Sequence, residues 1–538
     1  MDELRWSERF TAEEVAAYRV TGLWGDETLA DFVDRTADAR PDALCTTDGS
    51  RQLMWADARN QAWRLAGGLA RLGITAGDRV VVQLQNSIEA VLTYYALARL
   101  GAVMVPRMTM YREREVSDAI DRTEAKALVV PDSFRGFDHA AMAAALHQQC
   151  RSLDHVVVVG DAPAGTLEFD ALADAEQYAG PRPGPDDLHI ILFTSGTTAQ
   201  PKGVMHTFNT FVTCAKGLAR AFALTPDDIC LMPSPLMHNT GLQSGALVPA
   251  VTGCASVLQD VWEPNAGLEL IGRFGVTFSV GATPFVTMMI DAHDGGRHDL
   301  RSLRLFACGG APVPASVVRD AVAVLGCTLM TVFGQTESSL QTITRLDDPV
   351  ERVASSDGRA AEGTEVSLLD DDGREVPRGA QGEICSRGPG VMVGYWRDPE
   401  RTKEAFEFGW FHSGDLGRMD DAGYLRVTGR KKDIIIRGGT NISPSEIEEL
   451  LLEHPCVADV TVVGMPDRVL GEKACAFVVP VPGTSPTLAD LTSFLRQKKI
   501  AVQKLPERLE LRHELPRTAT GKVEKYRLRD ELVEPVAG

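Results

Sequence analysis

A run of small hydroxyl residues and glycine follows an apolar segment near residue 194. The segment 190–193 (Ile-Ile-Leu-Phe) predicts a buried strand, and 194–203 (TSGTTAQPKG) follows it directly. Backbone N–H groups and hydroxyls in such a loop can point inward at an anion, and Lys202 adds a positive charge. A helix beginning near His206 would aim its N-terminal dipole at the same place. The pattern predicts a phosphate-binding loop with Thr194, Ser195, Gly196, Thr197, Thr198 and Lys202 as candidate ligands.

Two carboxylates lie in polar segments further along the chain. Glu337 lies in 333–338 (FGQTES), and Asp415 lies in 412–417 (HSGDLG). Taken alone, Glu337 would be interpreted as a solvated turn residue and the loop as a Ser/Thr-rich surface turn.

These segments and several others occur in an order that resembles the adenylate-forming superfamily. That superfamily includes acyl-CoA synthetases, stand-alone aryl-acid adenylating enzymes, luciferases and peptide-synthetase adenylation domains. The further matching segments are 235–241 (PLMHNTG), 309–312 (GGAP), 429–433 (GRKKD) and 516–522 (PRTATGK). The resemblance extends from about residue 28 to 532, and Ala199 stands where relatives usually have glycine.

The resemblance implies a role for each matching residue. Lys522 would bridge the substrate carboxylate and the α-phosphate, Thr336 would bond a phosphate, and Glu337 would hold Mg2+. His238 would lie at the acyl pocket and the CoA tunnel, although a lone histidine is more often structural, and a lone lysine near a C-terminus is usually a solvated charge. The implied catalytic residues are Lys522, Thr336, Glu337 and His238, and the implied substrate-binding residues are His238, Asn239, Gly241 and Gly310.

The resemblance also implies cofactor contacts and a hinge. Phe333 would lie against adenine, Asp415 and Arg430 would contact the ribose or phosphate, and paired glycines at 438–439 would leave room for the pantetheine arm of CoA. Lys432 occupies the hinge position, where a few backbone dihedrals absorb a domain rotation. Beyond the loop, the implied cofactor-binding residues are Gly310, Ala311, Pro312, Phe333, Gly334, Gln335, Asp415, Arg430, Gly438 and Gly439.

The activity implied is ATP- and Mg2+-dependent adenylation of a carboxylic acid, followed by transfer to coenzyme A. Candidate pocket walls at 237–243, 279–289 and 308–312 are mostly apolar, which favours a hydrophobic acid. The pair His238-Asn239 resembles hydroxybenzoate-activating enzymes, whereas 257–262 (VLQDVW) resembles cyclohexanecarboxylate and medium-chain acyl-CoA ligases. We therefore expect a cyclic, aromatic or medium-chain acid. A carrier protein, an amine or another nucleophile could replace CoA, and a degenerate nucleotide-binding regulator is a further alternative that the intact charged residues oppose.

The elements that must position these residues alternate between helix and strand in the first half of the chain. Apolar residues at helical spacing over 55–72 and 88–100 alternate with short apolar runs at 80–84, 103–106, 127–131 and 155–160. Such alternation predicts α/β layers with parallel sheet. Short strands with Asp/Gly turns between 358 and 424 predict a small antiparallel barrel or sheet. The expected fold is an α/β chain with a large N-terminal adenylation domain (1–431) of layered subdomains plus a small β-barrel, and a smaller mobile α+β domain (432–538).

Composition narrows the class of protein. The chain has 538 residues, 44% hydrophobic and 24% charged, with a formal net charge of -19, so an acidic surface makes nucleic acid an unlikely partner. The ten cysteines form no CxxC pair, which is typical of reduced thiols in the cytosol. The first residues have no apolar signal-peptide core, and no apolar run is long enough to span a bilayer. These features predict a cytoplasmic protein whose partners are a small acid and, as an alternative, a carrier protein.

Overall fold

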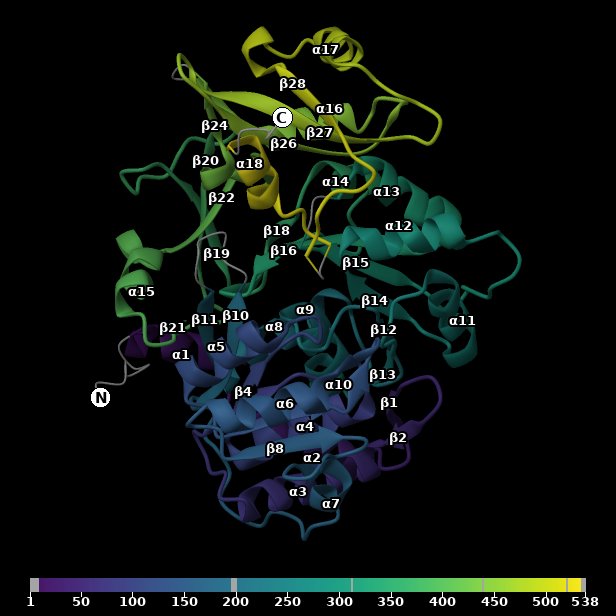
Figure 1. The fold of residues 1–538 in the computed structure, drawn as a ribbon, viewed down its shortest axis with the longest axis vertical. Helices are drawn as coiled ribbons and strands as arrows, with labels where there is room; N and C mark the ends of the chain where they lie inside the picture. Colours follow the sequence, from purple (N-terminus) through teal and green to yellow (C-terminus); the bar gives the residue numbers. More distant parts are fainter. Residues whose placement is uncertain (1–8, 195–200, 311–312, 438–439, 519–520, 534–538) are drawn as a thin grey trace. The chain divides into compact units, whose positions relative to one another are not determined.

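The computed structural model describes residues 9–194, 201–310, 313–437, 440–518 and 521–533 (Figure 1). The chain forms two compact units. Unit 1 comprises Met1–Ala354, Ala360–Glu365 and Ser386–Phe406, and unit 2 comprises Ser355–Arg359, Val366–Cys385 and Glu407–Gly538. The segment 366–385 therefore groups with the C-terminal residues, and the predicted domain boundary after residue 431 stays a prediction.

Unit 1 contains an eight-stranded sheet that is parallel from β10 to β9. Its strands are apolar on both faces, as expected for parallel strands covered by helices on each side. Helices α5 (Glu113–Thr123) and α6 (His139–Gln149) pack on one face through Val116, Ile120 and Leu146. The sheet order is β21 (Gly394–Tyr395), β11 (Lys202–Thr207), β10 (Leu188–Thr194), β4 (Val103–Pro106), β3 (Arg79–Val82), β5 (Ala127–Pro131), β8 (His155–Val159) and β9 (Leu167–Glu168).

A second sheet, with nine strands, is parallel in its centre and has antiparallel strands towards its ends. Phe306 and Leu329 face a core shared with α11 (Pro264–Phe274), α12 (Thr283–Ala292) and α13 (Ala315–Asp320). The order is β18 (Arg359–Ala360), β17 (Ser338–Ile343), β16 (Thr328–Gln335), β15 (Leu305–Gly309), β14 (Phe278–Gly281), β12 (Ile229–Met232), β13 (Ala255–Leu258), β1 (Leu44–Thr47) and β2 (Gln52–Met54).

Helix α4 (Ile88–Leu100) illustrates how local sequence sets element ends. Helix α4 begins after Ser87, whose hydroxyl accepts a hydrogen bond from the Ala90 N–H, and it ends at Gly101 with φ of 76°. The remaining helices that lie mainly or wholly in unit 1 are α1 (Ala12–Val20), α2 (Leu29–Ala39), α3 (Trp55–Arg71), α4 (Ile88–Leu100), α7 (Phe169–Ala173), α8 (Phe208–Ala221), α9 (Asn239–Leu242), α10 (Val248–Thr252), α14 (Val350–Ser355), α15 (Pro399–Ala405) and the π-helices η2 (Gln243–Leu247) and η3 (Ala321–Leu325). A short ribbon pairs β6 (Ser133–Phe134) with β7 (Phe137–Asp138).

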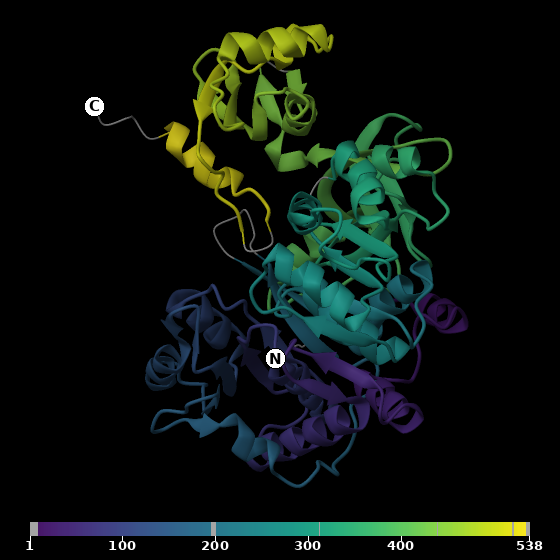
Figure 2. The same ribbon diagram turned by 90° about the vertical axis from the view of Figure 1, so that its right-hand side faces the viewer.

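Unit 2 contains two sheets. One has four strands in the order β19 (Glu365–Leu369), β20 (Gln381–Arg387), β22 (Phe411–Met419) and β23 (Leu425–Arg430). The other, in the yellow part of Figure 2, has five strands. One of its faces packs on α16 and α17 through Ile447 and Leu491, and the other contacts α18 through Leu528. Its elements are β24 (Ile435–Arg437), β25 (Thr440–Ile442), β26 (Val457–Asp467), β27 (Gly471–Pro480), β28 (Arg508–Leu511), α16 (Pro444–Leu451), α17 (Leu488–Gln497), α18 (Lys525–Val533) and the short 3-10 turns η4 (Glu407–Gly409), η5 (Lys431–Asp433) and η6 (Val502–Lys504).

The predicted α/β class is confirmed, and the small barrel or sheet predicted after residue 358 is the four-stranded sheet of unit 2. The helix predicted to begin near His206 is present, but its predicted dipole role at the loop is wrong. Residues Lys202–Thr207 form β11, which runs back antiparallel to β10, and α8 begins only at Phe208. Because Thr207 pairs with Leu188, the N-terminus of α8 is about 20 Å along the hairpin from the loop and cannot direct its dipole at a phosphate there.

Within the described residues, no helix combines the length and the apolar character needed to cross a bilayer.

Candidate active site

The predicted phosphate loop connects the two strands of the β10–β11 hairpin. Thr194 ends β10 and pairs with Lys202, the first residue of β11. The backbone at Gly203 lies close to Trp396, since a Cβ added at this position would be 3.1 Å from the Trp396 Cβ. The predicted ligands Ser195, Gly196, Thr197 and Thr198 lie outside the described residues. The structure therefore places both ends of the loop, and with them one hydroxyl and one ammonium group, at the same end of the hairpin.

Thr336 and Glu337 form the tip of a second hairpin, between β16 and β17. Gln335 pairs with Ser338 directly before and after the tip. Gly334 is required by close packing, since a Cβ there would lie 2.3 Å from the Ser339 carbonyl oxygen. Phe333 pairs with Thr342 and is half-buried. The residues of segment 333–338 are thus fixed by a tight turn, which projects Glu337 from the end of the sheet.

Tyr395 connects the two hairpins. Its hydroxyl donates a hydrogen bond to Glu337 Oε1 at 3.0 Å, and the Lys202 ammonium lies 3.4 Å from the same hydroxyl oxygen. Lys202 Nζ is also 4.7 Å from the centroid of the Tyr395 ring, which is a cation–π contact. Burial, with the negative charge of Glu337 beside it, raises the pKa of Tyr395, so the phenol stays protonated and acts as the donor. A positive and a negative side chain are therefore held on either side of one phenol.

His206 supports Thr336 from β11. Its Nε2–H donates to the Thr336 carbonyl oxygen at 2.8 Å, and its Nδ1 lies 3.1 Å from the Thr210 hydroxyl. The imidazole is fully buried, and burial lowers the pKa of His206 to about 4. The ring is therefore neutral near pH 7, with its proton on Nε2, and it fixes the backbone of the turn that carries Glu337.

The predicted acyl-pocket residues begin helix α9. His238 precedes the helix, and its Nδ1 accepts a hydrogen bond from the Thr240 N–H at 3.4 Å. The Asn239 amide donates to the Ser339 hydroxyl at 3.3 Å, which connects this segment to β17. A Cβ at Gly241 would lie only 2.0 Å from the Pro235 carbonyl oxygen, so the turn at 235–241 closes on itself. Asn239 and Glu337 therefore lie on segments that meet at β17.

Gly310 follows β15 directly and has φ of 79°, a conformation that favours glycine. Its neighbour Gly309 pairs with Val332, one residue before Phe333. The candidates Gly310 and Phe333 therefore lie at the carboxyl ends of adjacent parallel strands, where open α/β sheets bind ligands. Ala311 and Pro312 lie outside the described residues.

The ribose candidate Asp415 lies in the four-stranded sheet of unit 2. It is 6% exposed, its N–H donates to the Ser413 hydroxyl at 3.0 Å, and its Oδ1 accepts a hydrogen bond from Arg430 Nε at 2.8 Å. Asp415 and Arg430 also pair across β22 and β23. Two residues that the sequence assigned to the same ligand are thus in direct contact.

The remaining candidates that lie in the described residues, Lys432 and Lys522, are exposed side chains of unit 2. Lys432 lies in η5, between the two sheets of the unit. Lys522 ends a tight turn in which the Thr518 N–H donates to the Lys522 carbonyl at 2.8 Å, and Arg517 pairs with Asp459 of β26. Gly438 and Gly439 lie outside the described residues. The predicted roles of Lys432 and Lys522 stay predictions.

Tyr395 and His206 are the two site residues that the sequence did not identify as functional. Tyr395 follows a glycine in an ordinary apolar context, and nothing local indicates that it contacts Glu337. His206 has one local signal. It lies four residues after the phosphate-loop candidate Lys202 and two after Val204, so the three side chains share one face of β11.

Comparisons with known proteins identify the family of the chain. Residues 33–396 match the family model described as AMP-binding enzyme, and residues 446–522 match the AMP-binding enzyme C-terminal domain. The chain is 39% identical to the medium-chain fatty-acid–CoA ligase of Escherichia coli (strain K12), over 97% of this chain and 94% of that one. It is 34% identical to the 2,3-dihydroxybenzoate-AMP ligase of Bacillus subtilis (strain 168), over 97% of each chain.

Among solved structures, the chain is similar to the anthranilate CoA ligase AuaEII in complex with anthranoyl-AMP. The TM-score is 0.87 at 26% sequence identity, and the match covers 95% of this chain and 98% of that one.

Proposed function

This chain belongs to the AMP-binding enzyme family, and we propose that it uses ATP to convert a cyclic, aromatic or medium-chain acid to an acyl-adenylate and then transfers the acyl group to coenzyme A. The observation that carries the proposal is the contact between Lys202, Tyr395 and Glu337 beside the predicted phosphate loop. It provides a cation for phosphate oxygens and a carboxylate for a metal within one buried network.

The residues present fit a magnesium ion. Mg2+ is usually bound by one or two carboxylates together with substrate phosphates, and Glu337 provides one carboxylate at a hairpin tip. Tyr395 binds Oε1 of Glu337 and so fixes the orientation of the carboxylate. When bound, Mg2+ would neutralise negative charge on the phosphates. Lys202 would hold the departing pyrophosphate, and the Thr336 turn would be kept in place by His206.

The chemistry requires alignment and charge neutralisation more than covalent catalysis. The acid oxygen attacks the α-phosphorus and pyrophosphate leaves, while Lys522 neutralises the charge that develops at the α-phosphate. Cys308, next to the glycine pair at 309–310, is not a candidate nucleophile. Its thiol is fully buried, and burial raises the pKa of Cys308 to about 12, so the reactive thiolate is scarce.

The acid class is inferred from the pocket candidates and the relatives. Met237 and Met289 are buried, Phe285 is half-buried, and Phe285 packs edge-on against Trp262 at 5.3 Å. The segment 235–241 contains no aspartate that could bind an α-ammonium group, which argues against an amino acid. The two relatives named above act, by their names, on a medium-chain fatty acid and on 2,3-dihydroxybenzoate.

A second acceptor is kept as an alternative. The name 2,3-dihydroxybenzoate-AMP ligase mentions AMP and not CoA, and a carrier protein, an amine or another nucleophile would be the acceptor if this chain did not use CoA. A cytoplasmic location accompanies the proposal. All ten cysteines lie in the described part of the chain and have free thiols, as in a reducing compartment.

Acid-dependent exchange of labelled pyrophosphate into ATP tests the adenylation step. We expect exchange with at least one acid of a cyclic, aromatic and medium-chain panel. Lys522→Ala should abolish it and leave ATP binding, followed with a fluorescent ATP analogue, within about twofold. The matched control is Lys499→Ala, because Lys499 is another exposed lysine of unit 2 with no assigned role. Exchange that survives in Lys522→Ala would contradict the role of Lys522.

A further inference from the structure

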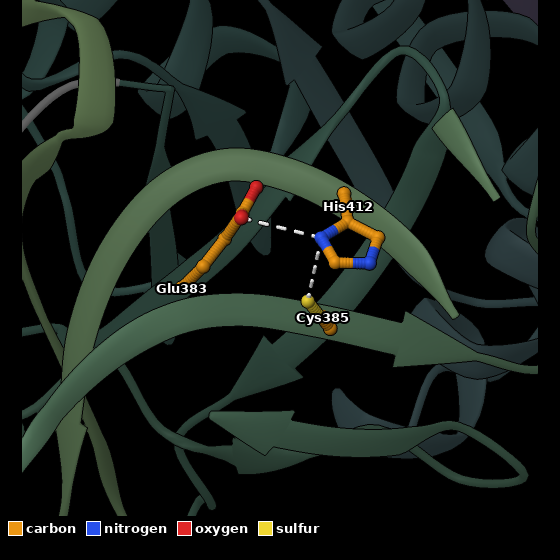
Figure 3. A group of neighbouring side chains, drawn as sticks. All are labelled: Glu383, Cys385 and His412. Carbon is orange, nitrogen blue, oxygen red and sulfur yellow. Dashed lines mark hydrogen bonds and ion pairs between the residues drawn. The ribbon is translucent and has the colours of Figure 1, made fainter. Parts of the chain in front are cut away.

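Three potential metal ligands converge in the four-stranded sheet of unit 2. Glu383 and Cys385 are two residues apart on β20 and therefore point to the same face, and His412 lies on the neighbouring strand β22. Figure 3 shows one ring nitrogen of His412 between the carboxylate and the sulfur. Nδ1 of His412 is 3.2 Å from Glu383 Oε2 and 3.4 Å from Cys385 Sγ.

The imidazole is oriented as in a metal site. His412 Nε2 lies 3.1 Å from the Glu407 carbonyl oxygen, to which it donates its proton. In the neutral ring the other nitrogen, Nδ1, then carries a lone pair that faces the carboxylate and the thiol. Metal-bound histidines typically donate their second N–H to a carbonyl or carboxylate in this way. Nδ1 and Oε2 are then both acceptors 3.2 Å apart, a contact that either a proton on Nδ1 or a metal ion between the two atoms would make favourable.

The separations match those around a tetrahedral ion. With Zn–N and Zn–O bonds of about 2.1 Å and a Zn–S bond of about 2.3 Å, tetrahedral angles place N and O about 3.4 Å apart and S and N about 3.6 Å apart. The measured values are 3.2 and 3.4 Å, and the ligand atoms of the three residues all lie within 4.8 Å of one another. The two distances from His412 Nδ1 therefore need to change by only about 0.2 Å each to accept an ion.

The neighbouring charges permit a divalent cation. Lys431 Nζ is 3.2 Å from Glu383 Oε2, but it is also 2.7 Å from Asp371 Oδ1 and keeps that partner if the carboxylate turns to a metal. Glu383 Oε1 accepts a hydrogen bond from the Gly414 N–H at 3.0 Å, which leaves Oε2 as the oxygen that faces the site. Glu383 and Cys385 are buried and the His412 side chain is 15% exposed, so His412 provides the side open to an entering ion.

We propose that Glu383, Cys385 and His412 form a binding site for Zn2+ or a similar thiol-binding divalent cation, with a water molecule as the fourth ligand. One sulfur, one imidazole nitrogen and one carboxylate oxygen are ligands that zinc accepts. On binding, the Cys385 S–H bond breaks, its proton passes to the solvent, and the sulfur electron pair forms the bond to the metal. Thiolate and carboxylate then balance the charge of the ion. The site is distinct from the proposed Mg2+ ligand Glu337.

Cobalt titration of the chelator-treated, reduced full-length protein tests the site without ATP or acid, so its outcome is independent of the proposed enzyme activity. We expect the near-ultraviolet absorption of Co2+–thiolate bonding to saturate at one equivalent and to disappear when Zn2+ is added. Cys385→Ser should remove this absorption. Glu383→Gln keeps an acceptor for the Gly414 N–H and should retain the absorption band. It should weaken Co2+ binding at least about tenfold, because losing even a residue that only supports a metal ligand typically weakens binding by about tenfold or more.

Cys456→Ser is the matched control, because Cys456 is a half-buried thiol of the same unit and its N–H donates to His454 Nδ1. It should bind Co2+ as the wild type does. The proposal is overturned if the wild-type protein shows no thiolate absorption, if the absorption persists in Cys385→Ser, or if it is lost in Cys456→Ser instead. Unchanged Co2+ affinity in Glu383→Gln, whose shape matches the original residue, would also overturn it. In the first case a proton, rather than a metal ion, joins His412 to Glu383.

Discussion

Replacing Tyr395 by phenylalanine removes the hydroxyl that joins Lys202 and Glu337. Tyr395 is 3% exposed and Glu337 is 7% exposed, and the hydrogen bond between them is 3.0 Å long. A hydrogen bond to a charged group contributes about 1.5–3 kcal/mol, and its loss leaves the carboxylate short of one partner in a buried position. We therefore expect Tyr395→Phe to lower the free energy of unfolding by about 2 kcal/mol. Urea denaturation followed by tryptophan fluorescence measures this change.

Tyr95→Phe is the matched control. Tyr95 is also fully buried in unit 1, but its hydroxyl donates to the neutral carbonyl of Ala246 at 2.9 Å, so its loss should cost only about 1 kcal/mol. A double-mutant cycle of Tyr395→Phe with Glu337→Ala should give a coupling energy above about 1 kcal/mol. Tyr395→Phe should also slow pyrophosphate exchange, whereas Tyr95→Phe should not. A coupling energy below about 0.5 kcal/mol would refute the proposed link.

Three further predictions concern pH and packing. Burial lowers the pKa of His206 to about 4, so the folded protein should lose roughly 3 kcal/mol of stability as the pH falls from ~6.5 towards 4. The unfolding free energy of His206→Gln should fall less over this range, and equal losses in the two proteins would contradict the assignment. Burial raises the pKa of Asp357, so the contribution of this carboxyl to stability is present at acidic pH and is lost as the pH rises. Asp357→Asn should therefore raise the melting temperature at pH 7, and this gain should shrink below pH ~4. A lower melting temperature of the variant at pH 7 would show that the contact of Asp357 with Arg426 outweighs the cost of burial. Gly241→Ala would place a Cβ 2.0 Å from the Pro235 carbonyl oxygen and should lower the free energy of unfolding, measured by urea denaturation, by about 3 kcal/mol. Gly296→Ala is the control and should be near neutral, because no atom lies within 4 Å of the added Cβ. Equal stability of the two variants would exclude the close contact.

The fold could be predicted well because its signals are local. The apolar spacing of 88–100 lies between a serine that caps α4 and a glycine that ends it, and the helix occupies those same residues. The parallel strands at 103–106 and 127–131 are short continuous apolar runs, which are typical of strands buried on both faces. The error about the helix dipole near His206 has a local cause as well. Lys202–Thr207 is short and follows a loop rich in Ser and Thr, and only its pairing with β10 identifies it as a strand.

The site could be predicted only in part, because its contacts join residues far apart in the chain. Glu337 and Lys202 were identified from motifs, but Tyr395, the side chain that connects them, is 58 residues after Glu337 and 193 after Lys202. Similarly, Cys385 and His412 are 27 residues apart and meet only because β20 and β22 are neighbours. Strand order is a property of the whole sheet, and single motifs contain no information about it.

The most direct test of the proposed function is a product analysis of the purified protein with ATP, Mg2+ and a pooled panel of carboxylic acids, with and without CoA. Mass spectrometry should reveal an acyl-CoA that appears only when CoA is present, together with AMP in equal amount. Acyl-adenylate or AMP without any acyl-CoA would contradict CoA as the acceptor and support a carrier protein or an amine. Absence of acid-dependent AMP formation across cyclic, aromatic and medium-chain acids would contradict the proposed activity.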